Sequence, residues 1–149
     1  MKAVIFIGIQ ATGKSTFYRD RFVDFYIRIN LDMLNTRRKE RMLLDACLAM
    51  NQSFVVDNTN PTEEDRTRYI RLAKQNGFEV DGYYFQSEIE AALQRNSSRM
   101  GKKKIPEAGI RSTYSKLELP DYHEGFDHLY YVSINESGEF EVNDWESDK

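Results

Sequence analysis

The segment Lys2-Ala3-Val4-Ile5-Phe6-Ile7-Gly8-Ile9-Gln10-Ala11-Thr12-Gly13-Lys14-Ser15-Thr16 sets the architecture of this chain. The apolar run Ala3–Ile7 predicts a strand that is covered on both faces. The next residues, Gly8–Ser15, fit the pattern G-x-x-x-x-G-K-[ST], known as Walker A, and a helix-compatible stretch follows to about Phe22. A strand, a glycine-containing loop and a helix in this order predict a site for phosphate groups.

Each fixed position of this loop has a physical reason. Gly8 and Gly13 permit backbone angles and close approaches that a β-carbon would block. The loop N–H groups then form a concave anion site, to which the following helix adds its positive N-terminal end. Lys14 can reach the β- and γ-phosphates of ATP, and the Ser15 hydroxyl can hold Mg²⁺. The residues expected to bind the nucleotide here are Gly8, Ala11, Thr12, Gly13, Lys14, Ser15 and Thr16.

The composition bounds the class of protein. With 149 residues and 40% hydrophobic content, the chain suits one domain, 1–149, with its own core. The net charge of −3 gives no overall signature of polyanion binding. The charge is uneven, because Ala91–Leu117 holds seven Lys/Arg and one acidic residue, whereas Glu118–Lys149 holds ten acidic residues and one cation. A local basic patch is therefore available to phosphates.

The expected cellular setting follows from cysteine content and from apolar runs. The single cysteine, Cys47, excludes an internal disulfide and lies in an apolar helical pattern, which favours a buried filler over a nucleophile. No run has the length of a signal peptide core or of a membrane span. We therefore expect a reduced, cytoplasmic protein with no membrane partner.

Strands and helices alternate along the chain, which predicts an α/β fold with a parallel sheet and helices on both faces. The expected strands are 3–7, 26–30, 53–57, 78–85 and 128–134, with 139–142 returning as a hairpin in a C-terminal region of about 128–149 whose tail, 143–149, is expected to be frayed. The expected helices are 14–22, 33–50, 61–76, 87–96 and 106–116. The basic, glycine-containing stretch at about 97–108 is a candidate mobile lid.

Two helix starts are expected from local signals. Asn60 is expected to cap a helix that has Pro61 in its first position. The segment Ser87-Glu88-Ile89-Glu90 has the pattern of a capping box. In parallel sheets, ligands gather at the carboxyl ends of strands, so the phosphate loop, Asp32 and the segment Asp57–Asn60 are expected on one rim.

The rim offers candidates for phosphoryl transfer. Asp32 follows a strand and can act as a general base on an acceptor hydroxyl, or it can simply cap the next helix; position alone leaves these two interpretations even. Asp57 ends an apolar strand, where an acidic residue supports Mg²⁺ with Ser15, although a turn residue would look similar. Asn58, Thr59 and Asn60 can hydrogen-bond an acceptor or its phosphate.

Two arginines near the lid are four residues apart. Arg95 and Arg99 share a helical face if the helix continues, and two guanidinium groups so placed can clamp a triphosphate. Taken alone, these residues are more typical of a solvated basic face. Lys102-Lys103-Lys104 are expected to be a solvated surface of the lid.

At this point the chain resembles the kinase module of the polynucleotide 5′-kinase/3′-phosphatase enzymes and small AAA-type P-loop kinases. The resemblance covers Val4 to about Val132. Five blocks carry it, and their order and spacing are more specific than the phosphate loop alone: Gly8–Phe17, Ile29–Asp32, Val55–Pro61, Arg95–Arg99, and Ile105-Pro106 with Tyr114 and Glu124-Gly125-Phe126.

The resemblance implies an ATP-dependent kinase that phosphorylates the 5′-hydroxyl of a polynucleotide. Lys14 and Ser15 would bind ATP and Mg²⁺, Asp32 would be the general base, and Arg95 and Arg99 would hold the phosphates, with Arg99 nearest the transferred group. The segment Asn58–Asn60 would lie beside the acceptor phosphate. No D-x-D-G-T phosphatase motif occurs, so kinase activity alone is expected.

Two departures from the family pattern keep other functions open. The family usually has Gly where this chain has Ala11, and it often has an acceptor-gripping Arg where this chain has Asn35; Arg37 or Arg38 is the candidate replacement. Asn35 and the acidic net charge favour a kinase for a small hydroxyl acceptor as one alternative. A nucleotide-binding module that hydrolyses ATP slowly and acts through a protein partner is another.

Overall fold

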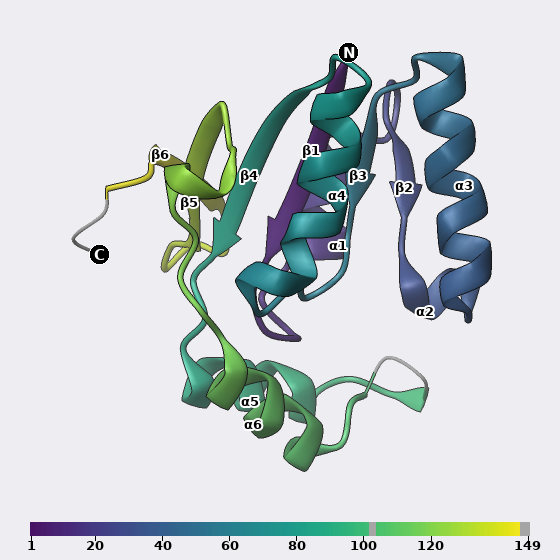
Figure 1. The fold of residues 1–149 in the computed structure, drawn as a ribbon. Helices are drawn as coiled ribbons and strands as arrows, with labels where there is room; N and C mark the ends of the chain where they lie inside the picture. The colour runs from purple at the N-terminus through teal and green to yellow at the C-terminus, as the bar shows by residue number, and fades with distance from the viewer. Residues whose placement is uncertain (102–103, 147–149) are drawn as a thin grey trace.

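A computed structural model describes residues 1–101 and 104–146 of the chain (Figure 1). Its centre is a six-stranded sheet in the order β2-β3-β1-β4-β5-β6. The first five strands are parallel neighbours, and β6 pairs antiparallel with β5. The strands are β1 (Lys2–Ile7), β2 (Ile27–Ile29), β3 (Phe54–Val56), β4 (Glu79–Phe85), β5 (His128–Ile134) and β6 (Phe140–Asp144). The predicted α/β fold is confirmed, with one antiparallel edge strand.

Helices cover both faces of this sheet, as predicted. The helices are α1 (Lys14–Arg21), α2 (Leu31–Leu34), α3 (Arg37–Met50), α4 (Glu63–Gln75), α5 (Ile89–Ser97) and α6 (Glu107–Lys116), with a short 3₁₀ helix at Tyr122–Glu124. Within the residues that the structure describes, no helix has the length and apolar character needed to cross a membrane.

Alternation along the buried strands divides the core in two. Ile5 and Ile7 of β1 pack with Leu44 and Cys47 of α3 and with α4 on one face. Val4 and Phe6 face the other way and pack with the aromatic side chains of α1. Because a β-strand sends successive side chains to opposite faces, the all-apolar β1 serves both cores. Cys47 is fully buried, and its burial raises the pKa of its thiol, in agreement with the predicted filler role.

The helices α5 and α6 form a separate pair at the carboxyl ends of the strands (Figure 1). Ala92 and Ile110 pack there against Ile9 and Ala11 of the phosphate loop. The Asn96 amide closes the base of the candidate lid, because it donates to the Ile105 carbonyl at 2.6 Å and accepts from the Ile105 N–H at 2.8 Å. Lys102 and Lys103 lie outside the described residues.

The single helix expected over 33–50 is wrong, because the chain forms two helices there. Asn35 adopts a left-handed conformation with φ 73° and ends α2. Thr36 then caps α3 by accepting a hydrogen bond from the Lys39 N–H. Asn tolerates positive φ, and Thr is a good N-cap, so the pair Asn35-Thr36 was the local signal for this break.

Both expected helix caps are also wrong. The helix α4 begins at Glu63 and is capped by Thr62, in a capping box with Asp65. Asn60 is buried with φ 45°, and its amide donates to the Phe6 carbonyl at 2.8 Å. The helix α5 has Glu88 at its N-cap, without a side-chain cap. Ser87 instead accepts a hydrogen bond from the Ile9 N–H, which ties the phosphate loop to the end of β4.

The expected C-terminal hairpin is confirmed, but the fraying expected from residue 143 is wrong. The strand β6 runs to Asp144 in register with Tyr130. Trp145 is buried against Tyr84 and Tyr131, with ring centroids 5.3 and 6.1 Å away. Burial of a large aromatic ring stabilises this edge of the sheet. Residues 147–149 of the predicted tail lie outside the described residues.

Candidate active site

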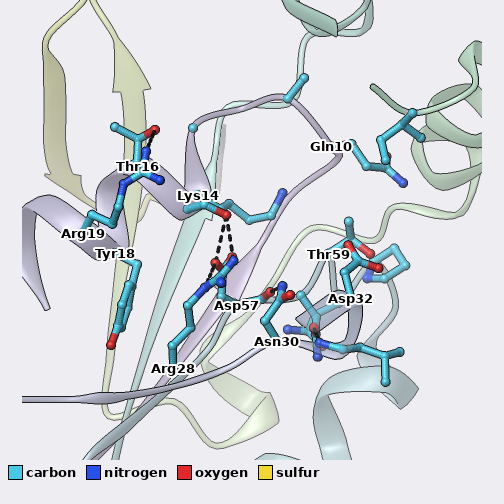
Figure 2. A pocket seen from close by; sticks show the side chains of 18 of the residues that line it. Gln10, Lys14, Thr16, Tyr18, Arg19, Arg28, Asn30, Asp32, Asp57 and Thr59 are labelled. Carbon is cyan, nitrogen blue, oxygen red and sulfur yellow. Dashed lines mark hydrogen bonds and ion pairs between the residues drawn. The ribbon is translucent and has the colours of Figure 1, made fainter. Parts of the chain in front are cut away.

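A cavity of about 820 Å³ lies at the carboxyl ends of the strands, beside the phosphate loop. Its lining comes from segments far apart in the sequence: the phosphate loop and α1, the ends of β2 and β3, and the lid stretch at Arg99 and Ile105. Figure 2 shows Lys14, Asp57 and Asp32 among the side chains around this cavity. The fold therefore brings the predicted rim together at one site.

The backbone of the phosphate loop requires a glycine at one position and tolerates strain at another. Gly13 has φ 93°, and a β-carbon there would lie 2.8 Å from the ring of Phe140. Ala11 has φ 63°, a left-handed conformation that costs an L-residue roughly 1–2 kcal/mol. Ala11 thus adopts a backbone conformation that glycine, the residue the family usually has here, reaches without strain.

Lys14 is folded back onto its own loop. Its ammonium group donates to the carbonyls of Gly8 at 2.9 Å and Ile9 at 2.6 Å, and lies 3.5 Å from the Thr12 hydroxyl. Burial lowers the pKa of Lys14 to about 8, while the carboxylate of Asp57 opposes this shift. A buried cation held only by neutral groups gains most from an anion, so the loop is prepared for phosphate.

Ser15, Asp57 and Arg28 form a closed hydrogen-bonded triangle. The Ser15 hydroxyl donates to Asp57 Oδ2 at 3.1 Å. Arg28 Nε donates to the same Oδ2 at 2.8 Å, and Arg28 Nη2 donates to Ser15 Oγ at 3.0 Å. The first contact brings together the two predicted Mg²⁺ ligands. The participation of Arg28 was not predicted, because it lies in the alternating strand Ile27–Ile29 and no local motif marks it.

Asp32 lies in the first turn of α2 and lines the cavity. The alternative in which it caps this helix is wrong, because Asn30 is the N-cap and accepts from the Met33 N–H at 2.9 Å. The Asn30 amide also donates to the Asp57 carbonyl at 2.6 Å. Asn30 thus fixes the end of β2 against the end of β3 and leaves the Asp32 carboxylate available for chemistry.

The three residues after Asp57 are used differently. Asn58 Oδ1 accepts from the Leu31 N–H at 2.8 Å, and the Asn58 amide donates to Glu40 at 2.9 Å. Asn60 is buried and holds Phe6, as described above. The Thr59 carbonyl accepts from the Gly8 N–H at 3.0 Å, and its side chain lines the cavity with Asp32. All three residues line the cavity, and the side chains of Asn58 and Asn60 also make hydrogen bonds that hold the rim together.

Glu40 is a buried carboxylate that the sequence reasoning missed. It lies on α3, is 3% exposed, and accepts hydrogen bonds from Tyr69, Arg37 and Asn58, each at 2.9 Å. Arg37, one of the two candidate replacements for the family arginine, is held in this way and lines the cavity. Arg38 is exposed and is not among the lining residues. Glu40 looked like one member of a charged helix face, so no local signal identified it.

The lid arginines do not share a helix. The helix α5 ends at Ser97, close to the expected end at about residue 96, so the condition under which Arg95 and Arg99 would share a helical face is not met. Arg95 donates to the Ala11 carbonyl at 3.2 Å, and Arg99 lines the cavity beyond the helix end. Both residues nevertheless approach the nucleotide side of the site, because α5 packs against the phosphate loop.

Fold and site together define a P-loop kinase. The family described as an AAA domain matches residues 4–120, and the chain belongs to this family of P-loop kinase domains. A curated relative, the bifunctional polynucleotide phosphatase/kinase of Schizosaccharomyces pombe, is 32% identical over 133 residues, which is 87% of this chain and 33% of the relative. The resemblance seen in the sequence is thereby confirmed. The chain spans about a third of the length of the curated relatives it matches.

Solved structures show the same fold. A gluconokinase from Sinorhizobium meliloti has 16% identity and a TM-score of 0.62, covering 89% of this chain and 82% of that one. Kti12 from Chaetomium thermophilum, in complex with ADP-AlF3, has 15% identity and a TM-score of 0.63, covering 91% of this chain and 92% of that one. At such identities the likeness is one of fold, shared by proteins with different names.

Proposed function

We propose that this chain transfers the γ-phosphoryl group of Mg·ATP to a hydroxyl, with Asp32 as general base, and that the acceptor is the 5′-hydroxyl end of a polynucleotide. The observation that carries the proposal is the shared cavity, which Asp32 lines together with the phosphate loop without serving as a helix cap. The charge of Asp32 also acts on Lys14, so the two groups are electrostatically coupled.

The residues present fit both parts of Mg·ATP. Oxygen ligands suit Mg²⁺, and Ser15 Oγ and the Asp57 carboxylate lie together beside the loop. When bound, the ion would neutralise charge on the β- and γ-phosphates. The loop from Gly8 to Thr16 would cradle the phosphates with its N–H groups, and Lys14 would leave its carbonyl partners for them. Arg99, which lines the same cavity, would stabilise the transferred group, and Arg95, which donates to the Ala11 carbonyl, would support the loop.

Proton transfer to Asp32 completes the proposed reaction. Asp32 accepts the proton of the acceptor hydroxyl while that oxygen forms a bond to the γ-phosphorus. The bond from the γ-phosphorus to the bridging oxygen breaks, and ADP leaves with that electron pair. Thr59, next to Asp32 on the lining, would orient the acceptor. The partly buried Asn58 and the buried Asn60 would act by fixing the rim.

Two observations favour a polynucleotide acceptor. The curated relatives are polynucleotide phosphatase/kinases by name. Arg37 also lines the cavity, held there by Glu40, and its guanidinium would be available to an acceptor phosphate. The absence of arginine at position 35 and the net charge of −3 favour a small hydroxyl acceptor as the second candidate.

Transfer of labelled γ-phosphate from ATP to 5′-hydroxyl DNA and RNA oligonucleotides tests the proposal. Label is expected on the oligonucleotide, with a loss of roughly 10²–10⁴-fold in Asp32→Asn. Lys14→Ala is expected to abolish transfer, and Asp20→Asn, which changes an exposed carboxylate of α1, is expected to leave it unchanged. Full transfer by Asp32→Asn contradicts the assigned base.

A panel of sugars, nucleosides and other small hydroxyl compounds distinguishes the remaining functions. Label on a small hydroxyl compound and none on oligonucleotides overturns the polynucleotide assignment and supports the second candidate. ATP binding through Lys14 with no labelled acceptor supports a regulatory nucleotide-binding module that works with a protein partner.

A further inference from the structure

The proposed metal site already contains a cation from the protein. Arg28 donates to both oxygens that would hold Mg²⁺, reaching Asp57 Oδ2 at 2.8 Å and Ser15 Oγ at 3.0 Å. Figure 2 shows the Arg28 side chain directed at Asp57. The Ser15 hydroxyl uses its own proton toward Asp57, so its lone pair is the acceptor for Arg28. Asp57 Oδ2, Ser15 Oγ, and the Nε and Nη2 atoms of Arg28 are thus each hydrogen-bonded to another member of the triangle.

The strand geometry explains why Arg28 reaches this place. Its neighbour Ile29 is fully buried in the core beneath α3, so alternation along β2 sends Arg28 to the opposite face, toward α1 and Ser15. The Asp57 side chain is 2% exposed, and a buried carboxylate needs a counter-charge. Arg28 supplies this charge while keeping 27% of its own side chain exposed, on the lining of the cavity.

We propose that Arg28 is the resident cation of the metal site and makes entry of the divalent metal dependent on nucleotide. This inference rests on the proposed function in taking Ser15 and Asp57 as the metal ligands. Arg28 holds both oxygens in place in the nucleotide-free protein, and it is displaced when metal and nucleotide arrive together. It is a positioning residue, which acts on the metal through Ser15 and Asp57.

Competition between the two cations follows from their contacts. Mg²⁺ binds its oxygen ligands at about 2.0–2.1 Å, and the guanidinium uses the same Oδ2 and Oγ atoms. A divalent ion placed there would also be repelled by the adjacent guanidinium charge. The phosphates of a bound nucleotide carry enough negative charge to hold both Mg²⁺ and the Arg28 guanidinium. The exposed part of Arg28 lies on the cavity, where its guanidinium can turn toward those phosphates.

Binding of Mn²⁺, followed by electron paramagnetic resonance of the free ion, tests this inference. Nucleotide-free Arg28→Gln is expected to bind one Mn²⁺ roughly tenfold more tightly than the wild type, because one opposing charge is gone. Arg19→Gln removes the same charge from the same cavity lining without touching Asp57 or Ser15, and is expected to stay within about twofold. Adding Asp57→Asn to Arg28→Gln should abolish the gain.

Arg28→Lys provides a second, charge-preserving variant. A lysine ammonium cannot bridge the two oxygens as a planar guanidinium does, so its Mn²⁺ affinity is expected between those of the wild type and Arg28→Gln. With ADP present, all three proteins should bind Mn²⁺ through Asp57, and their affinities should converge. Thermal unfolding of each variant verifies that it is folded at the titration temperature.

The outcomes separate this inference from the proposed function. Equal nucleotide-free affinities for the wild type and Arg28→Gln, with binding of Mn·ADP through Asp57 in both, overturn the role of Arg28 and leave the metal site intact. An equal gain in Arg19→Gln also overturns it, since the effect would then be one of general charge. If Asp57→Asn leaves the affinity for Mn²⁺ in the presence of ADP unchanged in every variant, the assignment of Ser15 and Asp57 as metal ligands is wrong.

Discussion

Two arginine–carboxylate pairs of this protein have opposite designs. Arg66 and Glu124 join α4 to the 3₁₀ helix through two parallel hydrogen bonds of 2.7 and 3.0 Å, and their side chains are 0% and 2% exposed. Arg66 Nη1 also donates to the carbonyls of Asn60 and Glu118. Arg28 meets Asp57 through a single carboxylate oxygen at the edge of an open cavity.

The difference teaches how one ion pair is made permanent and another exchangeable. Arg66 is the bidentate partner of Glu124 and fills its remaining donors with backbone carbonyls, so nothing from solvent can replace it. Arg28 shares the Asp57 carboxylate with the Ser15 hydroxyl. Water in the cavity can replace the hydrogen bonds that Arg28 makes. The first pair therefore suits a structural connection, and the second suits a site where a ligand arrives.

The largest expected effect comes from breaking the permanent pair. Arg66→Met leaves Glu124 charged and buried and removes the donors to the Asn60 and Glu118 carbonyls, so we expect a loss of about 3–5 kcal/mol in the free energy of unfolding. Urea denaturation measures it. Arg71→Met, on an exposed position of the same helix, should change the free energy by less than about 0.5 kcal/mol.

A second change at Glu124 sharpens this test. In Arg66→Met combined with Glu124→Gln, the uncompensated charge is gone, so part of the lost stability should return. A loss below about 1 kcal/mol in Arg66→Met alone would contradict a permanent structural role for the pair.

Lys14 extends the comparison to a buried cation without a carboxylate in contact. Lys14→Met is expected to stabilise the nucleotide-free protein by about 1–3 kcal/mol at pH 7, since each unit of depressed pKa corresponds to about 1.4 kcal/mol and the freed carbonyls offset part of the gain. The same change should abolish ATP binding. Urea denaturation with and without Mg·ATP measures both effects. The prediction is contradicted if the wild type is more stable than Lys14→Met in the absence of nucleotide.

The stability difference at Lys14 should depend on pH with a defined sign. Its pKa is about 8 in the folded protein, below the ordinary value of 10.5. Between these two values the unfolded chain keeps a proton that the folded chain has released, so the wild type gains stability as pH rises. The advantage of Lys14→Met should therefore be largest below pH 8 and shrink toward pH 10.5. A constant difference between pH 7 and pH 10 would rule out this origin.

The ion pair of Arg37 and Glu40 is intermediate in its expected contribution to stability between the Arg66–Glu124 and Arg28–Asp57 pairs. The Glu40 carboxylate is buried, but Arg37 is half exposed. Tyr69→Phe removes the hydroxyl that donates to Glu40 at 2.9 Å, and we expect a loss of about 1.5 kcal/mol. Burial and the Glu40 charge raise the pKa of Tyr69 to about 12, so the difference from wild type should shrink above pH 10, where the unfolded tyrosine ionises. Tyr114→Phe, on an exposed tyrosine of α6, is the matched control in urea denaturation.

The smallest expected effect on stability comes from the exchangeable pair. Arg28→Gln should lower the free energy of unfolding by about 1 kcal/mol or less, because Arg28 is itself 27% exposed and the Ser15 hydroxyl still donates to the buried Asp57 carboxylate. Urea denaturation of Arg28→Gln and Arg66→Met under one condition compares the two pairs directly. Equal losses would contradict the distinction between them.

Features encoded within a few consecutive residues were predicted well. The phosphate loop, the apolar strand before it and the position of Asp57 after a buried strand each follow from contiguous patterns. The parallel sheet followed from the alternation of strands and helices. The errors of detail lie where competing local signals were weighed wrongly, as in the break at Asn35-Thr36 and the helix cap at Thr62, which a neighbouring proline obscured.

Features that join distant segments could not be predicted. Arg28 lies 13 residues from Ser15 and 29 from Asp57, and the three come together only because β3 pairs with β2 on one side and with β1 on the other. Glu40 and Tyr69 belong to different helices and meet only because both pack on one face of the sheet. Trp145 looked like part of a polar tail until β6 placed it against Tyr84.

The sequence by itself determined that this chain binds phosphate groups on a parallel sheet, because loop geometry, glycine tolerance and strand periodicity are local properties of the backbone. It also supplied the residues of the candidate chemistry, Lys14, Asp32, Asp57 and Arg99. The tertiary structure alone decided which of them share a cavity and which cation contacts Ser15 and Asp57. The reason is physical, since burial and ion pairing depend on distances across the fold, and these distances exist only once the sheet has formed.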